Sequence, residues 1–239
     1  FPGFVFREVG ISVWPGELTA GQLKAEAVYT CIETTGKFEC SNDLFNTIKK
    51  IWWRSQTDNM HGGIASDCPN RERSPYTGDG QVACVTVMHN FDARPFYTKW
   101  IQDILGAQNL KTGYVPNGAP WQPGCGGGVA WGAAMSIMPW EFYMQYADTN
   151  MLRNNYDGMK GYIKYMLTWT DKSGIMNSQV PVRDGKPNTW MNLGDWSKLD
   201  KLPTDEMVHT FYPWRGADLT AKSAKVLVNT CEYRDYQKL

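Results

Sequence analysis

Three carboxylates and two arginines crowd one short segment of the chain, residues 67–79. Asp67 and Asp79 bound the segment, and Glu72 lies between them beside Arg71. Hydrolysis of a glycosidic bond generally requires two carboxyl groups, one of which protonates the leaving oxygen. Neighbouring carboxylates raise the pKa of such an acid and neighbouring arginines lower it, so the segment contains both means of tuning. The spacing leaves two interpretations open: a catalytic loop, and a solvated loop whose shape is fixed by arginine–carboxylate pairs.

The flanking segments indicate how such a loop would be held. Residues 61–80 contain glycine and proline without a clean apolar period, which predicts a loop long enough to need a functional reason. Before it, residues 42–58 carry apolar side chains at helical spacing, after the capping side chains of Ser41, Asn42 and Asp43. After it, residues 80–90 predict the next helix.

Helical patterns dominate the remainder of the chain, separated by irregular segments at 111–128 and 171–203. The further helices that we expect are one capped by Asp92 with Pro95 near its first turn, one over 129–146 bent or offset at Pro139, one near 156–169, one over 205–229 opened by Thr204, and the start of another within 232–239.

Strand signals are confined to the first part of the chain. Residues 4–9 and 26–34 are rich in Val, Tyr, Thr and Phe in rough alternation. The chain is therefore predicted to be mainly α, with a short β segment in front. Helical hairpins with alternating short and long loops favour a partial (α/α)6 toroid over a four-helix bundle, and at average helix length the chain supplies about half of such a ring.

Composition narrows the classes of partner. Lys plus Arg and Asp plus Glu both number 24 among 239 residues, so the formal net charge of zero argues against nucleic acid and against a polybasic membrane surface. No apolar run approaches the length of a membrane span. The six cysteines lack the CxxC spacing of a zinc site, and no other residues demand a metal or cofactor, so we expect neither. The 11 Trp, 12 Tyr and 9 Phe fit either a large core or recognition of a sugar by aromatic faces.

The loop sequence DCPNRERSPYTGDGQ resembles the signature of the bacterial α-L-rhamnosidases of glycoside hydrolase family 78. The flanking stretches TGKFECSNDLFNTI and VAWGAAMSIMPWEFYMQYAD also resemble family segments, as does the element NLGDW. The resemblance implies a six-hairpin glycosidase domain that removes terminal α-L-rhamnose with inversion. It also implies that residues 1–36 are the end of a β-sandwich and a linker strand, and that residues 37–239 are the N-terminal part of the catalytic domain.

The resemblance carries functional roles onto particular residues. Glu72 matches the general acid. The residues that match substrate-binding positions are Asp67, Arg71, Asp79, Trp131, Asp195 and Trp196. The general base would be a glutamate beyond Leu239, so the chain alone is expected to be inactive and to self-associate as a half-barrel. The intact enzyme is expected to be periplasmic or extracellular.

Two departures from the family pattern keep alternatives open. Ala133 stands where the family has Asp, and Ser74-Pro75-Tyr76 replaces the common Leu-Gly-Trp. The first alternative is a non-catalytic sugar-binding domain on the same fold. The second is a related toroid glycosidase that acts on another deoxysugar or on a uronic acid.

Overall fold

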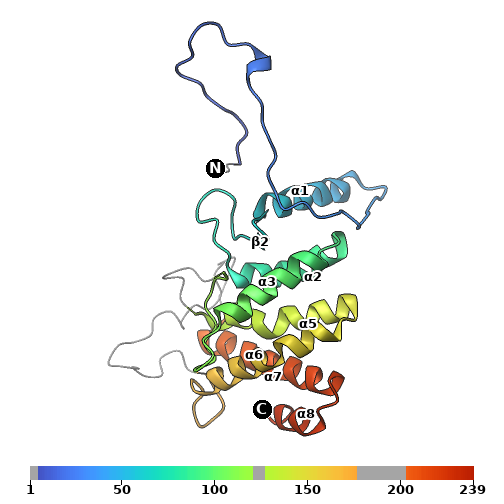
Figure 1. Cartoon of the computed structure of the whole chain (residues 1–239), viewed down its shortest axis with the longest axis vertical. Helices are drawn as coiled ribbons and strands as arrows, with labels where there is room; N and C mark the ends of the chain where they lie inside the picture. The colour runs from blue at the N-terminus through green and yellow to red at the C-terminus, as the bar shows by residue number, and fades with distance from the viewer. Residues whose placement is uncertain (1–4, 121–126, 177–202) are drawn as a thin grey trace, which may run out of the picture.

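The helices form a row in which neighbouring members run in opposite directions, apart from the two helices that follow one another across the single residue Ala133 (Figure 1). The computed structural model describes residues 5–120, 127–176 and 203–239. Its helices are α1 (Asp43–Asn59), α2 (Thr77–Asn90), α3 (Arg94–Ala107), α4 (Val129–Gly132), α5 (Ala134–Tyr146), α6 (Thr149–Leu167), α7 (Asp205–Val226) and α8 (Thr230–Tyr236), with a 3-10 turn η1 (Ala20–Gln22).

Four of the eight described α-helices begin where a polar side chain caps them: α1, α6, α7 and α8. Asn42 accepts a hydrogen bond from the Leu44 backbone at the start of α1, and Thr204 accepts one from Met207 at the start of α7, as the sequence predicts. The expected cap at Asp92 is wrong. Helix α3 begins one residue later, after Ala93, and its first turn relies on Pro95 because no side chain caps it.

The predicted helix over 129–146 is divided in two, but not at Pro139. Pro139 lies inside an unbroken α5, and the chain interrupts its helix at Ala133, between α4 and α5. The side chain of Tyr162 comes so close to Gly132 that a Cβ there would lie 2.9 Å from its ring. A glycine is therefore needed where α6 crosses this part of the chain, and the interruption directly follows it.

The two strands expected at the N-terminus are not formed. The described residues of 4–9 and 26–34 are irregular apart from a single bridge between Thr34 and Phe91. A strand requires a neighbour that shares a continuous ladder of hydrogen bonds, whereas residues 26–34 make single backbone bonds, such as Thr30 N–H to the Met60 carbonyl at 2.6 Å and Asp92 N–H to the Glu33 carbonyl at 2.8 Å. The short strands β1 (Met60–His61) and β2 (Ile64–Ala65) instead form a hairpin over Gly62 and Gly63, both with positive φ.

The core lies between the helices and holds the large aromatic and methionine side chains. Trp100, Tyr97, Tyr162 and Phe142 are fully buried. Helix α5 packs against α2, α3, α6 and α7, so it lies at the centre of the row. The described parts of the loops after β2, α3 and α6 all lie at the same end of the helices (Figure 1), as predicted for hairpins of a toroid. No described helix has both the length and the hydropathy needed to cross a lipid bilayer.

Candidate active site

Residues 67–76, which we call the carboxylate loop, form a closed turn that precedes α2. The Ser74 N–H donates to Asp67 Oδ1 at 2.9 Å, and the Asp67 N–H donates to the Ser74 carbonyl at 3.2 Å. These two hydrogen bonds join the two ends of the loop. Arg73 takes a φ of 52°, a conformation uncommon outside glycine, and this turns the chain back toward Asp67. The carboxylate of Asp67 therefore shapes the loop in addition to any role toward a ligand.

Glu72 lies at the exposed tip of this loop. Its backbone N–H donates to Cys68 Sγ at 3.3 Å, and its side chain is 36% exposed. The Arg71 guanidinium pairs with the Glu72 carboxylate at 2.7 Å, although Arg71 itself is 73% exposed. Exposed ion pairs of this kind contribute little to stability. Because its side chain is partly exposed, the Glu72 carboxylate is accessible to a ligand.

Asp79 lies in the first turn of α2 and faces the indole of Trp131. Burial raises the pKa of Asp79 above its ordinary value, and the negative charges of Asp67 and Glu72 add to the rise. A backbone hydrogen bond and a hydrogen bond with the Trp131 side chain oppose it. The structure thus places Asp79 against a half-buried tryptophan and within electrostatic range of the carboxylates of Asp67 and Glu72.

Three residues that sequence reasoning passed over hold this arrangement together. Thr77 is fully buried, and its hydroxyl lies 2.8 Å from the Trp131 carbonyl. The Gln81 amide donates to the Ala130 carbonyl at 2.8 Å. Asn117 is 2% exposed, and its carbonyl accepts the Thr77 N–H at 2.7 Å. The signal for Thr77 and Gln81 was their place inside the motif itself, and Asn117 lies in the segment YVPNGAP, which also resembles the family.

The remaining positions singled out in the sequence have different outcomes. Asp195 and Trp196 lie outside the described residues. Ala133 is fully buried in the hydrophobic core, so its methyl group does not line an accessible pocket. Tyr76, at the position of the family tryptophan, is half-buried and forms a bridge with Gly118.

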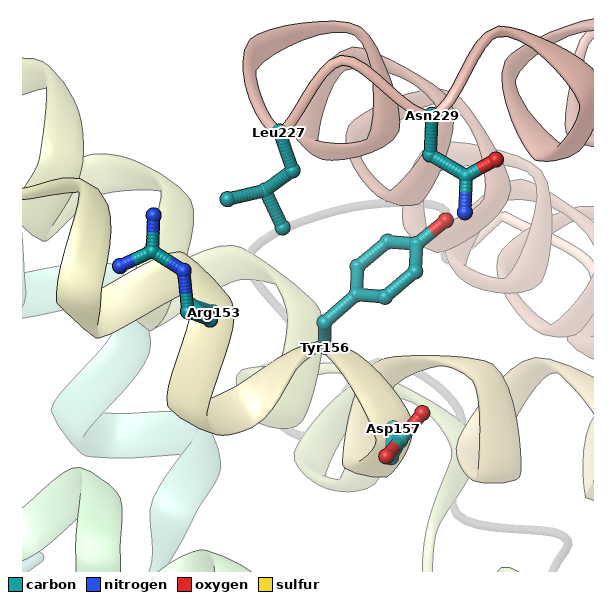
Figure 2. Close-up of a pocket in the computed structure, with 5 residues that line it drawn as sticks. All are labelled: Arg153, Tyr156, Asp157, Leu227 and Asn229. Carbon is teal, nitrogen blue, oxygen red and sulfur yellow. The ribbon is translucent and has the colours of Figure 1, made fainter.

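Elsewhere in the described chain, no cluster of three or more His, Cys, Asp or Glu side chains is arranged to hold a metal ion. A small cavity of about 250 Å³ opens between α6 and the junction of α7 with α8 (Figure 2). It is lined by Arg153, Tyr156, Asp157, Leu227 and Asn229. None of the motif carboxylates contributes to it. The chemistry available at the loop is that of carboxylic acids beside an aromatic face, which suits general acid catalysis on a neutral sugar.

Several α-L-rhamnosidases are similar to this chain in sequence, and solved ones are similar to it in fold. An α-L-rhamnosidase of Formosa agariphila is 32% identical over 207 residues, covering 82% of this chain and 20% of that protein. One from Alteromonas sp. (strain LOR) is 34% identical over 241 residues, covering 94% and 24%. The solved α-L-rhamnosidase from Dictyoglumus thermophilum superposes with a TM-score of 0.76 at 28% identity, covering 88% of this chain and 23% of that one.

The chain spans about a fifth to a quarter of the length of these relatives. The sequence model of the bacterial α-L-rhamnosidase six-hairpin glycosidase domain matches residues 33–239, which include the carboxylate loop and every described α-helix. This confirms the resemblance and the mainly helical, partial toroid fold. The chain therefore belongs to the bacterial α-L-rhamnosidase six-hairpin glycosidase family.

Proposed function

We propose that this chain supplies the acid-bearing part of the active site of an inverting α-L-rhamnosidase. The observation that carries the proposal is that Asp67 and Glu72 lie on one loop within electrostatic range of Asp79, which contacts Trp131. Membership of a family whose curated relatives are named α-L-rhamnosidases supports the substrate, a terminal α-L-rhamnose.

Each residue has a role in this proposal. Glu72, exposed at the loop tip, protonates the glycosidic oxygen as the rhamnosyl group gains oxocarbenium character. Asp67 and Asp79 accept hydrogen bonds from rhamnose hydroxyls, and Trp131 offers its face to the sugar ring. Arg71 binds or shapes the pocket through its ion pair with Glu72. Asp195 and Trp196 are proposed to line the same pocket.

The remaining catalytic group and the domain boundary are part of the proposal. Inversion requires a base about 6.5–9.5 Å from the acid, across the sugar, and we assign it to a glutamate outside this sequence. We propose that residues 1–36 end a preceding β-sandwich and that residues 37–239 begin the catalytic domain. The family match begins at residue 33, which supports this boundary. Further strands of the sandwich would supply the partners that the N-terminal segments lack here.

The decisive test is Glu72→Gln in a complete enzyme that carries this chain. Because positioned acid catalysis contributes about 10²–10⁴-fold, turnover of an aryl α-L-rhamnoside with a poor leaving group should fall by a factor in that range. Glu39→Gln is the matched control, because Glu39 is exposed in the segment before α1. Near-normal turnover by Glu72→Gln would exclude the assignment.

A non-catalytic sugar-binding domain gives a different result in the same experiment. It would bind L-rhamnose in calorimetry, and neither the unmodified protein nor the variant would turn the substrate over. This alternative rests on Ala133 in place of the family Asp and on the absence of a base from this sequence, and the turnover assay decides it. A panel of aryl glycosides would separate rhamnose from another deoxysugar or a uronic acid.

A further inference from the structure

We propose that Thr77 is a positioning residue whose hydroxyl fixes Asp79 and Trp131 relative to each other in the sugar pocket. The inference rests on the proposed function of this site. Thr77 does not reach the sugar in this proposal: it is fully buried and acts through the two residues that do.

Thr77 joins three segments that are far apart in the sequence. Its N–H donates to the Asn117 carbonyl at 2.7 Å, and its Oγ1 lies 3.0 Å from that same carbonyl. The same Oγ1 lies 2.8 Å from the carbonyl of Trp131. A hydroxyl has one proton, so it donates to these two acceptors in alternation or shares the proton between them. Either way, the first residue of α2 is held against both the 108–120 loop and α4.

Asn117 completes the junction from the other side. Its side-chain Oδ1 accepts a hydrogen bond from the Gly128 N–H, and Gly128 is the residue that precedes α4. Helix α4 carries Trp131, so the backbone of Asn117 is tied to α2 while its side chain is tied to α4. Because these groups are buried, each unmade bond would cost free energy, and the arrangement is therefore well determined.

Gly78 connects the hydrogen bonds of Thr77 to the distance between the Asp79 and Trp131 side chains. A Cβ on Gly78 would lie 2.8 Å from the indole of Trp131, so only a glycine lets the indole rest on the first turn of α2. Asp79 follows directly and interacts with that indole. A shift of Thr77 would therefore change the spacing between the Asp79 carboxylate and Trp131.

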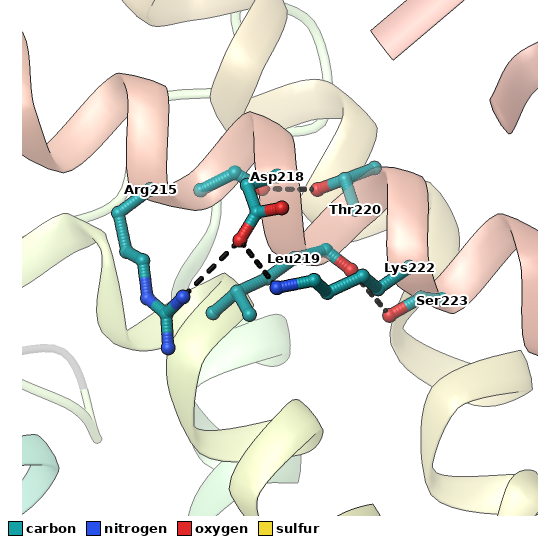
Figure 3. A network of polar contacts seen from close by, with 7 residues as sticks. Arg215, Asp218, Leu219, Thr220, Lys222 and Ser223 are labelled. Carbon is teal, nitrogen blue, oxygen red and sulfur yellow. Dashed lines mark hydrogen bonds and ion pairs between the residues drawn. The ribbon is translucent and has the colours of Figure 1, made fainter. Parts of the chain in front are cut away.

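The chain offers a matched control for this threonine. Thr220 in α7 is also fully buried, and its hydroxyl donates to the Gly216 carbonyl at 2.8 Å, within its own helix (Figure 3). Thr77→Val and Thr220→Val both remove one buried hydroxyl and keep the β-branched shape. The two substitutions should lower the thermal midpoint by similar amounts, whereas only the first should disturb the sugar pocket.

The kinetic test compares these variants in a complete enzyme that carries the chain. Misplacement of binding groups by about 1 Å can cost about 10²-fold, so Thr77→Val should lower kcat/KM for an aryl α-L-rhamnoside about 10- to 100-fold, mainly through KM. Thr77→Ser restores the hydroxyl and should recover most of the loss. Thr220→Val should leave KM unchanged. Equal kinetics for the two valine variants would overturn the inference.

A second measurement uses the complete enzyme that carries the chain and needs no turnover. In a spectrum of ¹⁵N-labelled tryptophan indoles, the signal of Trp131 is identified by its loss in Trp131→Phe. Thr77→Val should move that signal and Thr220→Val should not. An unmoved Trp131 signal would overturn the positioning role even in an active enzyme. If the unmodified enzyme failed to act on rhamnosides while the signal moved, the proposed function would fail and the positioning would stand.

Discussion

At the scale of single residues, Asp79 stands out because its surroundings oppose its charge. Burial is the largest cause of its raised pKa, and the like charges of Asp67 and Glu72 act in the same direction. The hydrogen bond with Trp131 compensates only in part, since the pKa remains raised above its ordinary value of 3.8. Ionised Asp79 therefore weakens the fold, as is common where a residue is kept for function at the expense of stability.

Because folding raises the pKa of Asp79, the effect of Asp79→Asn on stability should depend on pH. A carboxyl whose pKa is raised by folding favours the folded state while protonated, and that contribution is lost as the pH rises through the folded pKa. Asparagine stays neutral and keeps an oxygen for Trp131. The variant should melt about 1–3 °C higher at pH 7, and the gain should shrink as the pH falls toward 4.

Thermal melts across that pH range check the prediction, with Asp58→Asn as a control for loss of an exposed charge. The same Asp79→Asn variant should lose rhamnoside binding if the proposed function is right. A lower melting temperature than the unmodified protein at pH 7 would show that the carboxylate stabilises the fold, contrary to the pKa direction.

At the scale of elements, α2 depends on a glycine that lets it approach α3. A Cβ on Gly80 would lie 2.0 Å from the Trp100 ring, and Trp100 is fully buried with its Nε1 donating to the Ala119 carbonyl at 2.7 Å. Trp100 cannot turn aside without breaking that bond. Gly80→Ala should therefore destabilise the protein by about 1–3 kcal/mol through overpacking, although alanine is the better helix former.

Gly106 in α3 is the control for this substitution, because a Cβ there meets nothing within 4 Å. Gly106→Ala should stabilise the protein by about 0.5–1 kcal/mol. Denaturant unfolding of the two variants measures both values. If both alanines stabilised the protein, the close approach of α2 to Trp100 would be refuted.

These contacts also show which features a sequence alone can indicate. Caps such as Asn42 and Thr204 act within a few residues, so both helix starts were predictable. The need for glycine at position 132 depends on Tyr162 from another helix, and strands need partners, so neither feature is encoded locally. The motif located Asp67, Glu72 and Asp79. The link from Thr77 to Asn117 joins residues that only the fold brings together.

At the scale of the whole molecule, the two ends of the helical row present apolar faces. Exposed Leu44, Phe45, Ile48 and Ile51 recur at helical spacing along α1. At the other end (Figure 1), exposed Met207, Phe211 and Trp214 of α7 line a cavity of about 640 Å³. In a closed toroid every hairpin has a neighbour on both sides, whereas these side chains of α1 and α7 are exposed here, although α8 packs against another part of α7. Contiguous apolar faces of this kind are unusual in monomeric proteins and favour association.

We therefore expect the 239-residue chain by itself to associate with further copies through these faces, because each copy presents two of them. Light scattering after size exclusion should show a mass that grows with protein concentration. Ile48→Glu on α1 and Phe211→Glu on α7 should each reduce that growth, because a charge would have to be buried in the contact. Leu110→Glu changes an isolated exposed side chain in a loop and should have no effect. A single monomeric species at every concentration would contradict the prediction and would mean that both apolar faces remain exposed to solvent.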